Sequence, residues 1–203
     1  MQVVLATSNV AKQRELSELL APLQFELRLA REFGIASAPE TGDSFEANAE
    51  QKARFVAQRT GLPALADDSG LEVEALDGRP GIYSARYAGP GASDADNNAR
   101  LLTELAGLPA EQRRARYRCV LAFVRAVDDP VLLVGHGSWE GRIAEAPAGQ
   151  GGFGYDPLFI PDGYRQTVAQ LEPALKQALS HRARAARSLI GELRSLTQPL
   201  AVK

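Results

Sequence analysis

The sequence predicts a mixed α/β domain. Segments with the apolar spacing of strands alternate with segments that have the spacing of helices along the 203 residues, a pattern that favours strands and helices packed in layers. Two long apolar segments, residues 116–127 and 131–144, are separated only by Asp128-Asp129-Pro130, which predicts a hairpin. With 45% hydrophobic residues, the chain can bury a substantial core. We therefore expect one domain over residues 1–203, or one domain with two lobes, whose sheet is not purely parallel.

Each element is predicted from its own local pattern. Short apolar or alternating runs indicate strands, and apolar positions three and four residues apart indicate helices. In the first part of the chain these patterns predict a strand at 3–6, a helix at 10–21, a strand at 25–29, a turn at 41–44 and a helix at 45–60, which ends at Gly61. Further along they predict short strands at 63–66 and 71–73, a loop at 77–91, a helix from Ser93 to Leu105, a glycine-rich loop at 146–157 and a long helix at 174–196.

Composition excludes several classes of protein. The formal net charge is −2, so the basic excess of a protein that coats nucleic acid is missing, and we expect no nucleic-acid partner. The single cysteine, Cys119, cannot form a disulfide within the chain, which favours a reducing, cytoplasmic compartment. Cys119 lies in an apolar segment and is expected in the core rather than as a nucleophile. The first residues lack the charged and apolar regions of a signal peptide, and no apolar run is long enough to cross a membrane.

The first candidate site follows the first predicted strand. Backbone amides and the positive end of a helix favour an anion at such a junction, and a lysine and two hydroxyl groups lie within it. A capped helix with a solvated lysine would give the same pattern. The residues are Thr7, Ser8, Asn9, Val10, Ala11 and Lys12.

A lysine interrupts the apolar face of the helix at 45–60. Phe45, Ala49, Ala53 and Val56 share one stripe, and Lys52 falls inside it. Because lysine is seldom buried without a partner, its side chain either extends out to solvent or points into a polar site.

Two adjacent acids suggest a metal site. Asp67 and Asp68 follow an apolar strand directly, and neighbouring side chains on an extended backbone point to opposite faces. Together with Glu40, one of them would supply the hard oxygen ligands that Mg²⁺ prefers. Taken alone, two aspartates before Ser69-Gly70 are more often simply a turn.

The last predicted helix also carries a charge on its apolar face. If the helix continues past Ser180, Arg182 lies on the same face as Leu175, Leu179 and Leu189, either as a buried ion pair or as a ligand contact. Lys176 and His181 lie on its flanks.

The glycine-rich loop is not a dinucleotide-binding motif. Residues 149–154 fit G-x-G-x-x-G literally, but no clear parallel strand precedes them and the Tyr155-Asp156-Pro157 that follows does not open a helix. A loop that presents Phe153, Tyr155 and Asp156 is better suited to stacking on a base and forming hydrogen bonds with it.

Taken together and in order, these segments resemble the inosine triphosphatase family, also called Ham1-like, whose bacterial members are XTP/dITP diphosphatases. The matching stretches are Leu-Ala-Thr-Ser-Asn-Val-Ala-Lys (5–12), Glu-Thr-Gly-Asp-Ser-Phe-Glu-Ala-Asn-Ala (40–49), Ala-Asp-Asp-Ser-Gly-Leu (66–71), Pro-Gly-Ile-Tyr-Ser-Ala-Arg-Tyr (80–87), Gly-Gly-Phe-Gly-Tyr-Asp-Pro (151–157) and Ser-His-Arg (180–182). Departures include Pro39 before Glu40, where a second acid is frequent, and Leu175 before Lys176.

The resemblance implies a long, strongly twisted mixed sheet flanked by helices, two lobes with a cleft between them, and a homodimer. It implies hydrolysis of dITP, ITP and XTP to the monophosphate and pyrophosphate with Mg²⁺.

The resemblance also implies roles for individual residues. By position, Asp68 matches the proton acceptor and metal ligand, Glu40 a second acid near the metal, and Ser69 a substrate contact. Residues 7–12 match the phosphate-binding loop, and Lys52 is expected to help neutralise the phosphates. The residues that match the base-binding set are Phe153, Gly154, Tyr155, Asp156, Lys176, His181 and Arg182.

Three other functions remain open at this level. A nucleotide-binding regulatory module would keep the loops without needing Asp68. A nucleic-acid-binding domain would use the arginines of the last helix. A related pyrophosphatase would act on ordinary or pyrimidine nucleotides.

Overall fold

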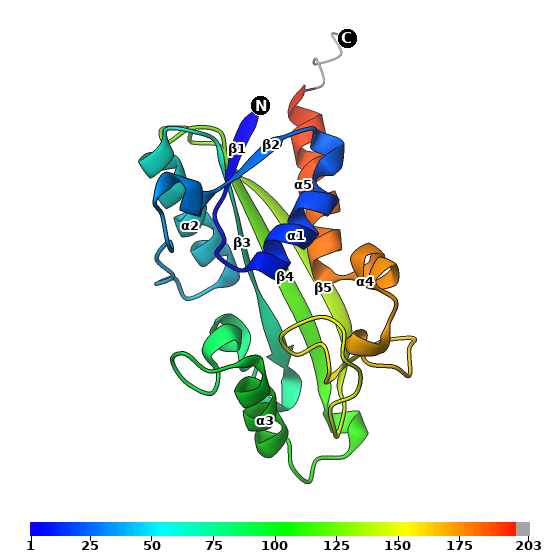
Figure 1. Ribbon diagram of the computed structural model, residues 1–203. Helices are drawn as coiled ribbons and strands as arrows, with labels where there is room; N and C mark the ends of the chain where they lie inside the picture. The colour runs from blue at the N-terminus through cyan, green and yellow to red at the C-terminus, as the bar shows by residue number, and fades with distance from the viewer. Residues whose placement is uncertain (198–203) are drawn as a thin grey trace. The chain divides into compact units, whose positions relative to one another are not determined.

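The computed structural model describes residues 1–197 and shows a mixed sheet with helices packed against it (Figure 1). Six strands are hydrogen-bonded in the order β2-β1-β3-β4-β5-β6. Their bounds are β1 (Gln2–Leu5), β2 (Glu26–Leu29), β3 (Ala64–Val73), β4 (Arg114–Val124), β5 (Leu133–Ile143) and β6 (Phe159–Pro161). β1 pairs in parallel with β2 and β3, whereas β5 and β6 are antiparallel. The predicted mixed α/β class is therefore confirmed.

The helices follow the predicted pattern closely at the N-terminal end and less closely at the C-terminal end. The α-helices are α1 (Val10–Leu19), α2 (Phe45–Thr60), α3 (Asp94–Glu104), α4 (Pro173–Leu179) and α5 (His181–Thr197). Short 3₁₀ helices are η1 (Ala21–Leu23), η2 (Ala30–Phe33), η3 (Glu74–Leu76), η4 (Gly81–Arg86), η5 (Ala110–Gln112) and η6 (Val168–Gln170). None of the described helices is long and apolar enough to cross a membrane.

The chain divides into two compact units. The first comprises Met1–Asp68, Cys119–Gly137 and the described residues from Arg182 onward, and the second comprises Ser69–Arg118 and Ser138–His181. β3, β4 and β5 contribute residues to both units. The single domain over 1–203 stays a prediction, and its residues 198–203 lie outside the described part of the chain.

The first unit has its own apolar core between strands and two helices. Leu16 and Leu20 from the α1 region and Ala185 and Leu189 of α5 are buried against side chains of β1, β3, β4 and β5. Cys119 lies in this core with only 1% of its surface exposed, as the sequence predicts, and burial raises the pKa of its thiol to about 12.

The second unit is built around aromatic residues. Tyr117, Trp139 and Phe159 form edge-to-face contacts within a core to which β3, β4, β5, β6 and α3 all contribute. Ser93 caps α3 by accepting a hydrogen bond from the backbone N–H of Asp96, and the Asp96 side chain accepts from Ser93 in return, so the predicted start of this helix is confirmed.

Two sequence-based predictions in the middle of the chain are wrong. The segments 63–66 and 71–73 are not separate strands around a turn, because β3 runs without interruption through Asp67-Asp68-Ser69-Gly70. A strand tolerates these acids here because lysines neutralise them from both faces. The predicted loop 77–91 contains the 3₁₀ helix η4, and the short strand β6 was not predicted.

The predicted continuous helix over 174–196 is also wrong. Ser180 takes an extended conformation (φ −61°, ψ 159°) immediately before α5, which is the position and geometry of an N-cap, and serine favours that position. The break separates the apolar face into two parts. Leu179 packs against the core of the second unit, whereas Ala186 and Leu189 belong to the core of the first.

One glycine marks the closest packing in the first unit. A Cβ atom on Gly135 of β5 would lie 2.3 Å from the carbonyl oxygen of Ala185 and 2.7 Å from Cβ of Leu189. Gly191, which lies on α5 itself, has open space where a Cβ would be. The absence of a side chain at Gly135 therefore sets how closely α5 approaches β5.

We expect Gly135→Ala to lower the free energy of unfolding by about 1–3 kcal/mol, because the added methyl group collides with backbone of α5. The matched control is Gly191→Ala, which is expected to raise it by roughly 0.5–1 kcal/mol because alanine favours a helix interior. Urea unfolding followed by circular dichroism measures both. Equal stability of the two variants would contradict the close packing described.

Candidate active site

The loop after β1 is folded by its own polar groups. Asn9 caps α1 by accepting a hydrogen bond from the backbone N–H of Lys12 (3.0 Å). The N–H of Asn9 donates to Thr7 Oγ1 (3.3 Å), and the side chain of Gln13 donates to the carbonyl oxygen of Thr7 (2.8 Å). The first turn of α1 contains no acid, so its positive end is not neutralised locally. The predicted phosphate-binding residues thus form a turn that leads into a helix N-terminus, while Ser8 and Val10 are exposed.

The two adjacent aspartates of β3 point to opposite faces, as an extended backbone requires. Asp67 Oδ2 lies 2.7 Å from Nζ of Lys12 on α1, and Asp68 Oδ1 lies 2.8 Å from Nζ of Lys52 on α2. Asp67 is 1% exposed and Asp68 7% exposed. Each carboxylate therefore has its own lysine, and each lysine comes from a different helix.

The environments of the two carboxylates shift their pKa values in opposite directions. Burial acts to raise the pKa of Asp67, but Lys12, Arg182 and Lys52 outweigh it and hold that pKa well below its usual range. Burial also raises the pKa of Asp68, and there the opposing effect of Lys52 is the smaller, so that its pKa lies above the ordinary value. Asp67 is thus ionised at neutral pH, and Asp68 is the better proton acceptor of the two.

Lys52 is buried within a polar cluster, which decides between the two alternatives left by the sequence. Its Nζ lies 2.9 Å from Glu40 Oε1 as well as 2.8 Å from Asp68 Oδ1, and the residue is 6% exposed. Burial acts to lower the pKa of Lys52, but the charges of Asp67, Asp68 and Glu40 outweigh it and raise that pKa. The ammonium group is therefore charged and bridges two carboxylates.

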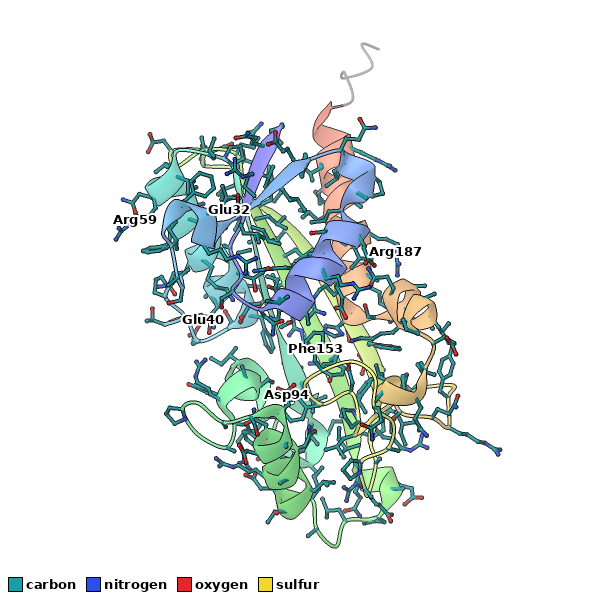
Figure 2. All side chains as sticks on the ribbon, viewed as in Figure 1. Glu32, Glu40, Arg59, Asp94, Phe153 and Arg187 are labelled. Carbon is teal, nitrogen blue, oxygen red and sulfur yellow. The ribbon has the colours of Figure 1, made fainter. Side chains whose placement is uncertain are left out.

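Asn48, one turn before Lys52 on α2, completes this cluster. Its Nδ2 lies 3.4 Å from Asp68 Oδ2, and its Oδ1 accepts a hydrogen bond from the N–H of Gly42 (2.8 Å). A Cβ on Gly42 would lie 2.9 Å from that same Oδ1. The Glu40–Gly42 segment thus reaches α2 only because Gly42 has no side chain. Figure 2 labels Glu40 on the segment that precedes α2.

The carboxylates of Glu40 and Asp68 supply the kind of hard oxygen ligand that a magnesium ion prefers. Oxygens of Glu40 and Asp68 lie 2.9 and 2.8 Å from the same nitrogen of Lys52, so two hard oxygen donors lie on either side of one ammonium group. Within residues 1–197 no group of three or more His, Cys, Asp or Glu side chains could hold a metal. Mg²⁺ commonly binds to one or two carboxylates and takes its other ligands from water and substrate phosphates.

A pocket of about 520 Å³ in the first unit adjoins these groups. Its wall includes Thr7 and Ser8 of the predicted phosphate-binding loop, together with Glu40 and Lys52. Two residues of the predicted phosphate-binding loop, one predicted metal ligand and Lys52 therefore share one cavity.

In the second unit, Asp156 organises the residues predicted to bind the base. Its Oδ2 accepts a hydrogen bond from the N–H of Phe153 (2.9 Å) and lies 2.7 Å from Lys176 Nζ. The hydroxyl of Tyr117 donates to its Oδ1 (3.3 Å). Lys176 Nζ also lies 4.5 Å from the centre of the Phe153 ring, and His181 stacks on Tyr117 with ring centres 4.5 Å apart. Residues distant in sequence are thus brought together around one carboxylate.

The start of α3 fixes the glycine-rich loop. The N–H of Gly154 donates to Asp94 Oδ2 (2.6 Å), and Asn98 Nδ2 donates to the carbonyl oxygen of Gly154 (2.8 Å). Figure 2 shows Asp94 beside the loop that carries Phe153. Both backbone groups of Gly154 are therefore tied to α3.

Two residues of the predicted base-binding set also form contacts within the protein, and their binding of a base stays a prediction. Tyr155 is 4% exposed and its hydroxyl donates to the carbonyl oxygen of Ser84 (2.8 Å), so its side chain supports the core of the second unit. Arg182 belongs to the first unit, is 2% exposed and forms an ion pair with Glu15 of α1. Ser69 is half-buried on β3, next to Asp68.

Several residues of these clusters were not predicted from the sequence. Asn48 was foreseeable, because it lies four residues before Lys52 on the same side of a helix. Glu15, Asp94, Asn98 and Tyr117 gave no local signal, because their partners lie far away in the sequence.

Comparison with known proteins identifies the family. The Ham1 family profile matches residues 3–192. The chain belongs to the Ham1 family. A protein of Vibrio parahaemolyticus described as a dITP/XTP pyrophosphatase is 50% identical over 196 residues, which cover 97% of this chain and 98% of the relative. A Methylococcus capsulatus protein of the same description is 52% identical over 196 residues, with the same coverage.

Solved Ham1 structures have the same fold. The structure of a HAM1 protein from Coxiella burnetii superposes with a TM-score of 0.88 at 43% identity and covers 96% of this chain and 99% of that one. A Staphylococcus aureus Ham1 protein gives a TM-score of 0.86 at 36% identity, with 97% of this chain and 100% of that one covered. The family suggested by the ordered sequence segments is therefore confirmed.

The ion pair of Asp67 predicts a pH-dependent contribution to stability. Because the pKa of Asp67 is lower in the folded state than in the unfolded state, its stabilising effect is complete above the unfolded value of about 4 and is lost as the pH falls toward the folded value. We expect Asp67→Asn to lower the free energy of unfolding by about 3 kcal/mol at pH 7.

Urea unfolding of the wild type and Asp67→Asn between pH 7 and pH 3 measures this effect. The difference between the two proteins should stay constant down to about pH 5 and narrow below about pH 4. A difference that keeps its full size down to pH 3 would show that Asp67 does not contribute as a buried anion.

Proposed function

We propose that this chain hydrolyses dITP, ITP and XTP to the nucleoside monophosphate and pyrophosphate, and so removes deaminated purines from the nucleotide pool. The observation that carries the proposal is the Glu40–Lys52–Asp68 cluster beside a phosphate-binding loop, in a chain about half identical to proteins described as dITP/XTP pyrophosphatases. A binding module would not require a buried carboxylate whose pKa is raised.

We assign the triphosphate to groups of the first unit. Water attack on a phosphate chain is opposed by its negative charge until that charge is neutralised. Lys12, Lys52 and the backbone amides at the start of α1 supply positive charge for this purpose. Glu40 and Asp68 would hold Mg²⁺, which supplies Lewis-acid polarisation and further neutralisation when bound.

Asp68 acts as the general base in this proposal. Its carboxylate orients a water molecule and accepts one of its protons as the water oxygen bonds to the α-phosphorus. The bond between the α-phosphorus and the bridging oxygen of the β-phosphate breaks, and pyrophosphate leaves with the bonding electrons. Asn48 and Lys52 hold the carboxylate in place from α2.

The Asp156–Lys176 pair accounts for the preference for a 6-oxo purine over adenine. The two groups lie 2.7 Å apart, so an acceptor and a donor are presented side by side. Hypoxanthine offers the complementary edge, with an acceptor at O6 and an N–H at N1, whereas adenine offers a donor and an acceptor in the reverse order. Because Arg182 is almost completely buried, whereas Lys176 lies beside the ring of Phe153, we assign the O6 donor to Lys176. Phe153 would stack on the ring.

We further propose that the chain works as a homodimer in the cytoplasm. The family resemblance supports the dimer, and the lone buried Cys119 supports a reducing compartment. Light scattering during size-exclusion chromatography tests the dimer, and a monomeric mass at micromolar concentration would contradict it.

The function is tested by pyrophosphate release from dITP, XTP, dGTP and dATP with Mg²⁺. We expect fast release from dITP and XTP only. Asp68→Asn should reduce that rate by roughly 10²–10⁴-fold, because the proton acceptor is lost. The matched control is Asp128→Asn at an exposed position, which should leave the rate unchanged. Equal rates with all four bases would indicate a general nucleotide pyrophosphatase, and no release would favour a binding module.

The assignment of Lys176 gives a separate expectation. Lys176→Gln should lower kcat/KM for dITP by about 10–100-fold and narrow the preference for dITP over dATP, because the charged donor aimed at O6 is lost. Lys176→Arg should retain part of the preference. If Lys176→Gln changes the rates for both bases by the same factor, Lys176 does not read the base.

A further inference from the structure

The pocket of the first unit is also lined by a charged residue, Arg31, to which no role has been assigned. Besides Thr7, Ser8, Glu40 and Lys52, it is lined by Ala30 and Arg31 of η2 and by the segment 35–38 that follows it. Arg31 is therefore a third charged side chain on the wall of a cavity that already contains phosphate-binding groups.

The lysines near this cavity are already committed to carboxylates. Lys12 pairs with Asp67, and Lys52 pairs with both Glu40 and Asp68. These two lysines thus serve three carboxylates within the protein itself. An incoming chain of phosphates needs more positive charge than these pairs leave available.

Arg31 differs from both lysines in this respect. In the part of the chain that the structure describes, no carboxylate forms an ion pair with its guanidinium. The adjacent Glu32 is engaged elsewhere, because its carboxylate accepts from the N–H of Leu29 and from Nε of Arg28, each at 2.7 Å. Arg31 acts on Glu32 only through its charge, so the N–H donors of its guanidinium can bind an anion that enters the pocket.

The rest of the wall suits the end of a phosphate chain. Ala30, Ile35, Ala38 and Val56 are apolar and offer no side-chain hydrogen bond, so the charged and hydroxyl groups decide what binds. A guanidinium can donate two parallel hydrogen bonds to one phosphate. The hydroxyl groups of Thr7 and Ser8 can add neutral donors.

We propose that this pocket is the subsite for the pyrophosphate part of the substrate and that Arg31 binds its terminal phosphate. The inference rests on the proposed pyrophosphatase function and extends it, because it names the residue that distinguishes a triphosphate from a shorter chain. Arg31 then contributes to the binding of triphosphate and pyrophosphate, but not to that of the monophosphate.

Comparing how the two reaction products bind distinguishes a contact with the terminal phosphate from a general effect of the Arg31 charge. Inorganic pyrophosphate carries the groups that Arg31 would bind, whereas dIMP lacks them. Isothermal titration calorimetry in the presence of Mg²⁺ gives the Kd of each product and requires no turnover. The variants are Arg31→Gln and Arg31→Lys. The matched control is Arg14→Gln, which removes the same charge from an exposed side chain of α1 in the same unit.

We expect Arg31→Gln to raise the Kd of pyrophosphate about tenfold, the loss typical of one charge-assisted hydrogen-bonded contact at an exposed residue. The KM for dITP should rise by a similar factor, and the Kd of dIMP should not change. Arg31→Lys should give an intermediate Kd, because it keeps the charge and loses the paired donors. Arg31 is exposed, so we expect the variants to fold.

Three results would overturn the proposal. One is a pyrophosphate Kd in Arg31→Gln equal to that in Arg14→Gln. Another is equal weakening of pyrophosphate and dIMP. The third is no binding of pyrophosphate by the wild type. Failure of the proposed function is distinct, because it would appear as wild-type protein that binds pyrophosphate but releases none from dITP.

Discussion

The first unit depends on the neutralisation of two adjacent carboxylates inside a strand. Asp67 and Asp68 are buried, and each would be costly without a cation. Lys12 and Lys52 provide the cations from α1 and α2, which fixes both helices against β3. Since a buried ion pair contributes little net stability compared with apolar side chains, we infer that these four charges are present for chemistry. The same arrangement lowers the pKa of Asp67 and leaves that of Asp68 raised.

Local patterns predicted the elements that local interactions determine. The bounds of α2 and the cap of α3 follow from Ser44, Gly61 and Ser93, residues whose capping chemistry is visible in the sequence. The Asp67-Asp68-Ser69-Gly70 segment was mistaken for a turn, because turn residues compete with strand propensity and only the lysines of distant helices decide the outcome. The break of the last helix at Ser180 also depends on distant contacts, because the segments before and after it pack into different cores.

The sequence revealed those site residues whose charge interrupts the apolar face of a helix. Lys52 and Arg182 stood out in this way, and both are buried with carboxylate partners. The identity of those partners was not accessible, because Glu15 and Arg182 lie 167 positions apart and Tyr117 reaches Asp156 from another strand. The loop that carries Phe153 suggested base stacking from its own sequence, and the ordered family segments were needed to connect it with Lys176 and His181.

The position of the water-derived oxygen tests the proposed chemistry most directly. A single turnover of dITP in ¹⁸O-water, with both products examined by mass spectrometry, shows which phosphorus was attacked. Attack at the α-phosphorus by a water that Asp68 orients predicts one ¹⁸O atom in dIMP and none in pyrophosphate. Label in pyrophosphate, or in inorganic phosphate released together with dIDP, would contradict the account.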